Sequence, residues 1–123
     1  MREPGGSKEA ESIRNLLLKK QNIKFNALTD TLLYLAARNE HVQNIIKPAI
    51  SKKKIVICDR FIDSTIAYQV YGKRVERNLV DSVHKFILKN IKPDITFLLK
   101  VNISKAFKRL KKLSLIHIIR SRR

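Results

Sequence analysis

Cysteine, tryptophan and glycine are scarce in this sequence of 123 residues, which holds one cysteine, no tryptophan and three glycines. A single cysteine excludes an internal disulfide and fits a reducing compartment, so we expect a cytoplasmic protein. Cys58 lies within an apolar run, which favours a buried and unreactive thiol. No apolar run approaches the roughly 18 residues that a membrane-spanning helix needs. The first residues are polar, and we therefore expect no signal peptide and no membrane partner.

Two common catalytic signatures are also missing. The three histidines, His41, His84 and His117, have no cysteine or histidine at the spacing of zinc ligands, so we expect no metal site built from them. No G-x-S-x-G motif is present, which argues against a hydrolase with that nucleophile elbow. Any chemistry must therefore rest on other residues.

Acidic residues are few beside the basic ones: 10 Asp and Glu against 27 Lys and Arg, a net charge of +17. Such a charge suits a polyanionic partner, either a nucleic acid or a phosphorylated small molecule. It equally fits a general bias toward lysine in a lysine- and isoleucine-rich sequence. The lysines are scattered, and no aromatic-rich RNA-binding signature lies among them. The exception is the C-terminal end, where no acid follows Asp94 while lysines and arginines accumulate.

The apolar spacing predicts helices that alternate with two short strands. Ser7 can cap a first helix, Thr29 or Asp30 can begin a second, and Pro48 interrupts it or starts a short new helix. A short helix or turn follows from residue 63, and a further helix covers 75–90. The apolar runs Ile55–Cys58 and Ile95–Val101 are typical of strands buried on both faces. This alternation predicts an α/β fold with a parallel sheet and flanking helices.

Two pairs of residues could bind a nucleotide. Tyr34 and Arg38 stand four apart on one helical face, where a ring can stack on a base and a guanidinium can bind its edge or a phosphate. The same spacing fits a core tyrosine beside a surface arginine. Asp59 and Arg60 directly follow a predicted strand, where functional side chains of open α/β sheets collect. The alternative for this pair is a surface ion pair.

The order and spacing of several motifs resemble one family. "REPGG", "IRNLLL", "LLYLAAR", "VICDRFIDSTIAYQ" and "KPDITFLL" follow one another as in bacterial thymidylate kinases. The resemblance covers residues 2 to about 110. It implies a partial thymidylate kinase domain over 1–112, with a sheet like that of P-loop nucleoside-monophosphate kinases, and a basic, non-matching tail over 113–123.

The resemblance also implies roles for particular residues. In that family the matching positions place Glu3 near the sugar, Arg14 on the substrate phosphate, Tyr34 against the thymine ring and Arg38 on the base edge. Arg60 matches the arginine that holds the phosphate during transfer, with Asp59 beside it. The remaining positions around base and sugar are Ser64, Thr65, Tyr68 and Gln69, of which Tyr68 is a candidate for excluding the ribose 2′-hydroxyl. The implied reaction is phosphoryl transfer from ATP to dTMP with Mg²⁺, giving dTDP, in a family that commonly forms homodimers.

The sequence departs from the family in two ways. It contains no G-x-x-x-x-G-K-[ST] loop to cradle the ATP phosphates, and its only glycines are Gly5, Gly6 and Gly72. The family's first strand, which is central in its sheet, has no match here. "KLSLIHIIRSRR" does not resemble the family's arginine-bearing lid. We therefore expect a chain truncated at both ends relative to the family, with a dTMP site but no ATP site.

Three interpretations remain open on these residues. The chain is a thymidylate kinase fragment that is inactive alone, or a working kinase whose missing parts come from a complementing N-terminal fragment or from a misassigned start codon. The third is a basic nucleic-acid-binding protein that reuses the scaffold.

Overall fold

The computed structural model describes residues 3–18 and 24–110. The chain divides into two compact units, residues 1–92 and 93–123, and each is described by itself. In the part that the structure describes, no helix is long and apolar enough to cross a membrane. The tail predicted at 113–123 lies outside the described residues.

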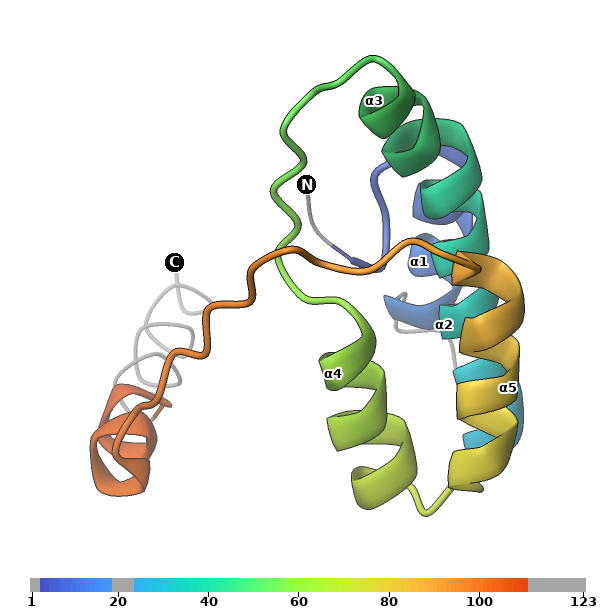
Figure 1. The fold of residues 1–123 in the computed structure, drawn as a ribbon. Coiled ribbons are helices and arrows are strands. Elements are labelled where there is room, and N and C mark those ends of the chain that lie inside the picture. Colours follow the sequence, from blue (N-terminus) through green and yellow to red (C-terminus); the bar gives the residue numbers. More distant parts are fainter. Residues whose placement is uncertain (1–2, 19–23, 111–123) are drawn as a thin grey trace, which may run out of the picture. The chain divides into compact units, whose positions relative to one another are not determined.

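The first unit begins with a loop and the helix α1, Lys8–Leu18 (Figure 1). Ser7 caps this helix as predicted, since its hydroxyl accepts a hydrogen bond from the Ala10 amide at 3.1 Å. Glu9 and Glu11 lie in the first turn, where the helix dipole favours negative charge. α1 packs against the next helix.

That next helix, α2, covers Ala27–His41 and starts two residues before the predicted position. The reason is its cap: the side chain of Asn26 accepts a hydrogen bond from the Thr29 amide at 2.8 Å. A π-helical turn, η1 (Val42–Ile46), and the short helix α3 (Lys47–Ser51) continue from it. Pro48 stands in the first turn of α3, as predicted, where its missing N–H costs no hydrogen bond.

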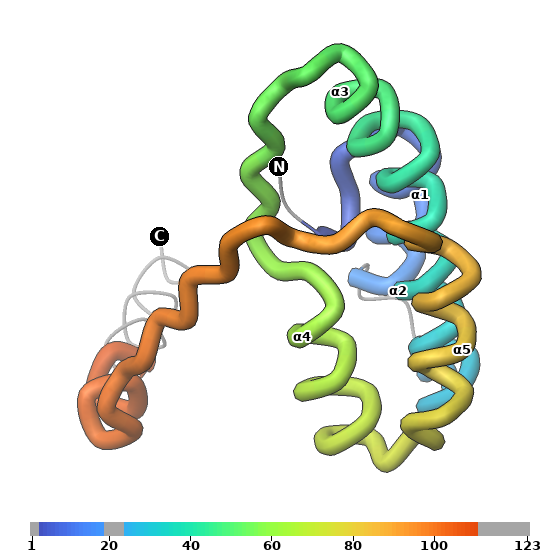
Figure 2. Tube along the Cα trace, viewed as in Figure 1, coloured from blue at the N-terminus to red at the C-terminus, as the bar shows by residue number. Residues whose placement is uncertain are grey.

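The chain then runs through residues 52–61, which are largely irregular, and forms a helical arm (Figure 2). This arm consists of α4 (Ile62–Thr65) and the π-helical η2 (Ile66–Gly72). The last helix of the unit, α5, covers Arg77–Leu88 within the range predicted for it. α5 packs on both α2 and η2, so α2 and the helical arm are held on either side of it.

The core of this unit lies where η1, α2 and α5 meet. Leu35, Val42, Ile46, Ile87 and Leu88 form one buried cluster, with Phe61 and Val56 packed against it from the segment 52–61. Burying large aliphatic side chains of this kind contributes about 1.5–3 kcal/mol each. This cluster fixes the spacing between α2 and the segment that leads into α4.

The two predicted strands are not found among the described residues, and their burial was predicted wrongly. Residues 54–58 and 95–101 belong to no strand, and an isolated bridge at Asp59 is the one β-type residue described. Ile55 is 92% exposed and Phe97 85% exposed. A buried strand needs neighbouring strands for its backbone groups and covering layers for its side chains. The described residues form no strand at either place, so the parallel sheet predicted from the sequence is not confirmed.

The second unit is described only in part. Residues 93–102 form no regular structure and 103–110 are helical. Asn102 begins this helix, because its side-chain oxygen accepts a hydrogen bond from the Ser104 amide at 3.0 Å.

Candidate nucleotide site

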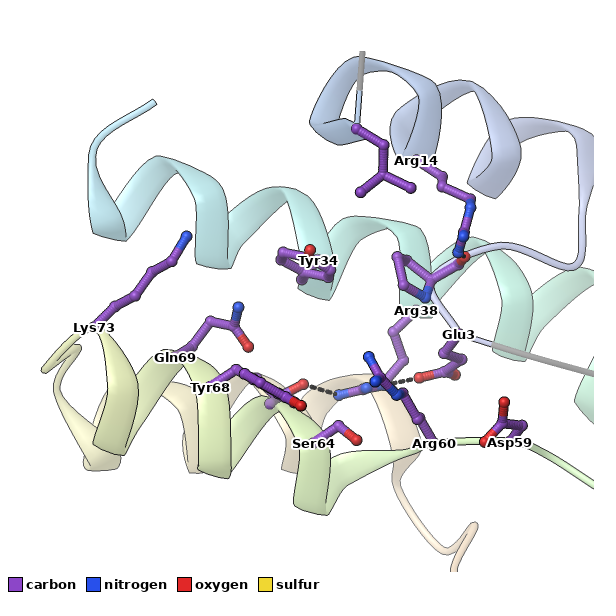
Figure 3. Close-up of a pocket in the computed structure, with 13 residues that line it drawn as sticks. Glu3, Arg14, Tyr34, Arg38, Asp59, Arg60, Ser64, Tyr68, Gln69 and Lys73 are labelled. Carbon is purple, nitrogen blue, oxygen red and sulfur yellow. Dashed lines mark hydrogen bonds and ion pairs between the residues drawn. The ribbon is translucent and has the colours of Figure 1, made fainter. Parts of the chain in front are cut away.

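A cavity of about 660 Å³ lies within the first unit, between α2 and the arm formed by α4 and η2. Figure 3 shows side chains from both sides and from the N-terminal loop facing this space. All ten residues predicted for the site line it: Glu3, Arg14, Tyr34, Arg38, Asp59, Arg60, Ser64, Thr65, Tyr68 and Gln69. Their joint lining of one cavity is the main structural finding, although their individual roles stay predictions.

Arg38 is the centre of the site and is buried, with 5% of its surface exposed. Its Nε donates to the Glu3 carboxylate at 2.6 Å, and its Nη1 donates to the Thr65 hydroxyl at 2.8 Å. Nη2 donates to the Phe61 carbonyl at 3.0 Å, and the guanidinium lies 5.3 Å from the centre of the Phe61 ring. The alternative that Arg38 is a surface arginine is therefore excluded, because its charge is paired and held in a fixed orientation.

Glu3 joins the N-terminal loop to this arginine and to α2. Its second carboxylate oxygen lies 3.2 Å from Nδ1 of the fully buried His41. Its backbone N–H donates to the Asp59 carbonyl at 3.1 Å, which ties the loop to the segment before α4. The loop over residues 3–6 is thus held by the buried Glu3 side chain as well as by its backbone.

Glu3, His41 and Cys58 also form a group whose possible ligand atoms lie within 4.8 Å of one another. Sequence spacing could not reveal this group, because its members are far apart in the chain. The Glu3 charge is already paired with Arg38. Burial, together with the Glu3 charge, raises the pKa of the Cys58 thiol to about 11, so it stays protonated at neutral pH. Of this group, His41 hydrogen-bonds Glu3, whereas the Cys58 thiol donates to the Arg60 carbonyl at 3.3 Å.

Arg14 reaches the site from α1 and approaches it through the loop. Its Nη1 donates to the Pro4 carbonyl at 2.6 Å, and its Nε lies 3.9 Å from the Glu11 carboxylate. Because these contacts leave part of the guanidinium uncommitted among the described residues, Arg14 can still bind an anion in the cavity that it lines.

Arg60 follows Asp59 at the edge of the cavity and is exposed. Its backbone has a φ of 66°, a left-handed conformation that is uncommon for a residue with a side chain and clusters at functional sites. Its guanidinium lies 5.4 Å from the centre of the Tyr68 ring, and no ion pair with Asp59 forms among the described residues. The alternative of a surface ion pair between them is therefore not supported.

Three further residues line the cavity that the sequence did not single out for it: Pro4, Leu18 and Lys73. Lys73 follows η2, and its ammonium group lies 2.7 Å from the Asp30 carboxylate at the start of α2. This exposed pair bridges the two sides of the cavity far from Arg60.

Gly6 is required by the packing of this loop. Its φ is +106°, and a Cβ at this position would lie 2.6 Å from the buried His41 ring. We expect Gly6→Ala to lower Tm by at least roughly 5 °C, since it adds backbone strain and displaces the partner of Glu3. Gly72→Ala is the matched control, because its Cβ would meet only the Ala67 carbonyl oxygen at 3.5 Å. Thermal unfolding followed by circular dichroism measures both, and equal Tm values for the two variants would contradict this account.

Comparisons with known proteins point to one family. The family model for thymidylate kinase matches residues 1–118. The thymidylate kinases of Ehrlichia chaffeensis and Mycoplasma capricolum are 48% identical over 108 residues and 47% identical over 109 residues. These matches cover 88% and 89% of this chain, but 52% and 51% of the relatives.

A solved structure supports the same relation. The crystal structure of the Ehrlichia chaffeensis thymidylate kinase aligns with a TM-score of 0.70 and 51% identity, over 78% of this chain and 52% of that one. The chain thus spans about half the length of the relatives and of the structure that it matches. On the match of the family model to nearly all of its residues, this chain belongs to the thymidylate kinase family.

Proposed function

We propose that the cavity is the dTMP site of a thymidylate kinase, the enzyme that transfers a phosphoryl group from ATP to dTMP. The relatives that the chain resembles are named thymidylate kinases. The observation that carries the proposal is the buried Arg38, fixed in orientation at a cavity that also contains an aromatic ring, that of Tyr34. This pair gives a base both a stacking face and a hydrogen-bond donor.

The phosphate of the nucleotide is negatively charged, and in the proposal two other cations bind it. Arg14 and Arg60 line the same cavity, and neither is consumed by a carboxylate in the way that Arg38 is. Phosphoryl transfer is catalysed mainly by positioning and by neutralising charge. In the proposal, Arg14 binds the acceptor phosphate and Arg60 holds it during transfer.

In the proposal, polar residues of the helical arm form hydrogen bonds with the sugar and the base. Ser64, Thr65 and Gln69 present hydroxyl and amide groups along the cavity, and the Tyr68 ring stands over Arg60. Thr65 already accepts a hydrogen bond from Arg38, so its oxygen couples the two sides of the site. Tyr68 is the proposed residue for excluding a ribose 2′-hydroxyl.

The residues of the cavity fit a bound Mg²⁺ but do not fit ATP. Asp59 offers a carboxylate at the cavity that could orient a water of a bound Mg²⁺, whereas the Glu3 carboxylate is taken by Arg38 and His41. No Walker A loop occurs in these 123 residues, so they do not fit the ATP phosphates. We therefore derive no step through ATP from this chain and propose that it binds the acceptor nucleotide only.

We also propose that the partial parallel sheet forms when the two predicted strand segments pair with a further strand. The exposed Ile55 and the exposed apolar residues at 95–101 are suited to pairing with a further strand, supplied by sequence outside these 123 residues or by another chain. The complementing fragment, the homodimer and a cytoplasmic location are likewise proposals. The nucleic-acid alternative gains no support from a specific contact, and we do not propose it.

Titration of the 123-residue chain with dTMP and with thymidine tests this function. We expect dTMP to bind more tightly than thymidine, because only dTMP carries the phosphate that Arg14 and Arg60 would bind. Arg60→Ala should weaken dTMP binding by about tenfold, as expected for loss of one charge-assisted hydrogen bond. It should leave thymidine binding unchanged.

Lys54→Ala is a matched control, since it removes an exposed cation that does not line the cavity. Equal affinity of the unchanged chain for dTMP and thymidine, measured by calorimetry, would contradict the proposed phosphate site.

A further inference from the structure

A buried histidine stands behind Arg38, outside the residues that line the cavity. His84 lies on the inward face of α5 with Val80, Ile87 and Leu88, and only 5% of it is exposed. Its Nε2 lies 2.6 Å from Nη1 of Arg38. This contact joins α5 to the centre of the site and has no role in the proposal above.

The chemistry of this contact fixes the state of the imidazole. A guanidinium can only donate, so Nε2 must accept and the proton must lie on Nδ1. Burial, followed by the positive charge of Arg38, lowers the pKa of His84 to about 4. The other charged groups that act on it are Asp81 and Arg77 on its own helix and Glu3 beyond Arg38. The ring is therefore neutral at pH 7 and serves as an acceptor.

A histidine at position 84 is less favourable for the stability of the fold than an apolar side chain would be. Its Nδ1 is buried and makes no hydrogen bond with any described residue. A buried N–H without a partner costs free energy that an apolar side chain in the same place would not. The benefit of the histidine must therefore lie in the acceptor that it offers to Arg38.

The contacts of Arg38 show what that acceptor achieves. Of the five N–H groups of a guanidinium, Nε is used by Glu3, the two on Nη1 by Thr65 and His84, and one on Nη2 by Phe61. Within the described contacts this leaves one Nη2 N–H for a ligand in the cavity that Arg38 lines. Because the guanidinium is planar, fixing Nη1 also fixes the direction of this remaining N–H.

We propose that His84 is a positioning residue for base recognition, which orients Arg38 so that its remaining N–H is offered to a carbonyl acceptor. This inference rests on the proposed dTMP site. Thymine carries an oxygen acceptor at position 4, where cytosine carries an amino donor. A fixed donor therefore favours dTMP over dCMP, whereas a mobile guanidinium discriminates less.

The experiment compares His84→Leu with His84→Gln in the 123-residue chain. Leucine fills the space but cannot accept, while the glutamine oxygen can take the place of Nε2. We expect His84→Leu to weaken dTMP binding about tenfold and to lower the dTMP:dCMP affinity ratio by a similar factor. His84→Gln should restore most of both. Lys85→Gln, an exposed neighbour on α5, is the control and should change neither.

A base-free probe separates this role from a structural one. Binding of 1,2-dideoxyribose 5-phosphate, which has the sugar and phosphate but no base, should stay within twofold of the unchanged chain in His84→Leu. The Tm of this variant should stay within a few degrees as well. Equal losses for dTMP and for the base-free probe, or an unchanged dTMP:dCMP ratio in His84→Leu, would overturn the inference. Failure of the unchanged chain to bind dTMP would instead overturn the proposed function.

Discussion

Replacing Arg38 with alanine is expected to abolish dTMP binding. The substitution removes the donor proposed for the base edge and also the partner of Glu3, Thr65 and His84. The loss should exceed a hundredfold, because a charged hydrogen bond is lost while the buried Glu3 carboxylate loses its arginine partner. Calorimetric titration with dTMP measures it. Retained affinity in Arg38→Ala would refute the role given to this residue.

Arg38→Ala should also destabilise the fold, so a second variant is needed to separate loss of binding from loss of folding. Breaking a buried pair by removing one partner costs about 3–5 kcal/mol, a large part of the stability of a domain this size. Arg38→Lys keeps a positive charge opposite Glu3 but lacks the planar fork that holds several partners. We expect it to fold, as judged by circular dichroism, and to bind dTMP at least tenfold more weakly. Wild-type affinity in this folded variant would also contradict the account.

The second large effect is the absence of turnover. The 123-residue chain should bind dTMP yet show no ATP-dependent formation of dTDP, because it contains no loop that can cradle the ATP phosphates. Product formation followed by chromatography of radiolabelled nucleotide gives the measurement. The thymidylate kinase of Ehrlichia chaffeensis, assayed in parallel, is the positive control. Measurable turnover by the purified chain would refute this prediction.

A complementation assay extends this result. If a polypeptide carrying the family's first strand and Walker loop is added, dTDP formation should appear and should depend on Arg60 of this chain. Activity in the mixture that is unchanged by Arg60→Ala would mean that the added polypeptide acts alone.

The candidate site rests on the family resemblance more than on local sequence patterns. Spacing alone offered two separate pairs, Tyr34 with Arg38 and Asp59 with Arg60, and it was the family resemblance that placed them at one site with the helical arm. Within the described residues, these side chains do line one cavity. The burial of Arg38 could not be predicted, because it depends on the distant Glu3 and His84.

The strands were predicted less well. Ile55 and Ile57 have the composition of a buried strand, but composition reports only what a segment can form with suitable neighbours. Helix starts depended instead on local caps, and Ser7 was identified correctly while Asn26 was missed in favour of Thr29 or Asp30. Local signals therefore fixed the helices, whereas long-range pairing did not follow from them.

The support behind the site was invisible at the sequence level. His41 and His84 were considered only as zinc ligands, since the sequence spacing of histidines reports metal sites and little else. In the structure each contacts a member of the site, Glu3 or Arg38. A histidine on the apolar face of a helix, as at His84 beside Val80 and Ile87, was the one available signal.

Mapping dTMP onto the amides of the chain by NMR tests the central claim most directly. Titration should shift the amides of residues that line the cavity, such as Thr65, Gln69 and Leu18, in a saturable manner. The amides of Ile50 and Asn90, which border a separate hollow near α3, should not move. Saturable shifts confined to the cavity are the predicted result. No shifts at Thr65 and Gln69, or equal shifts at both places, would contradict a dTMP site built around Arg38.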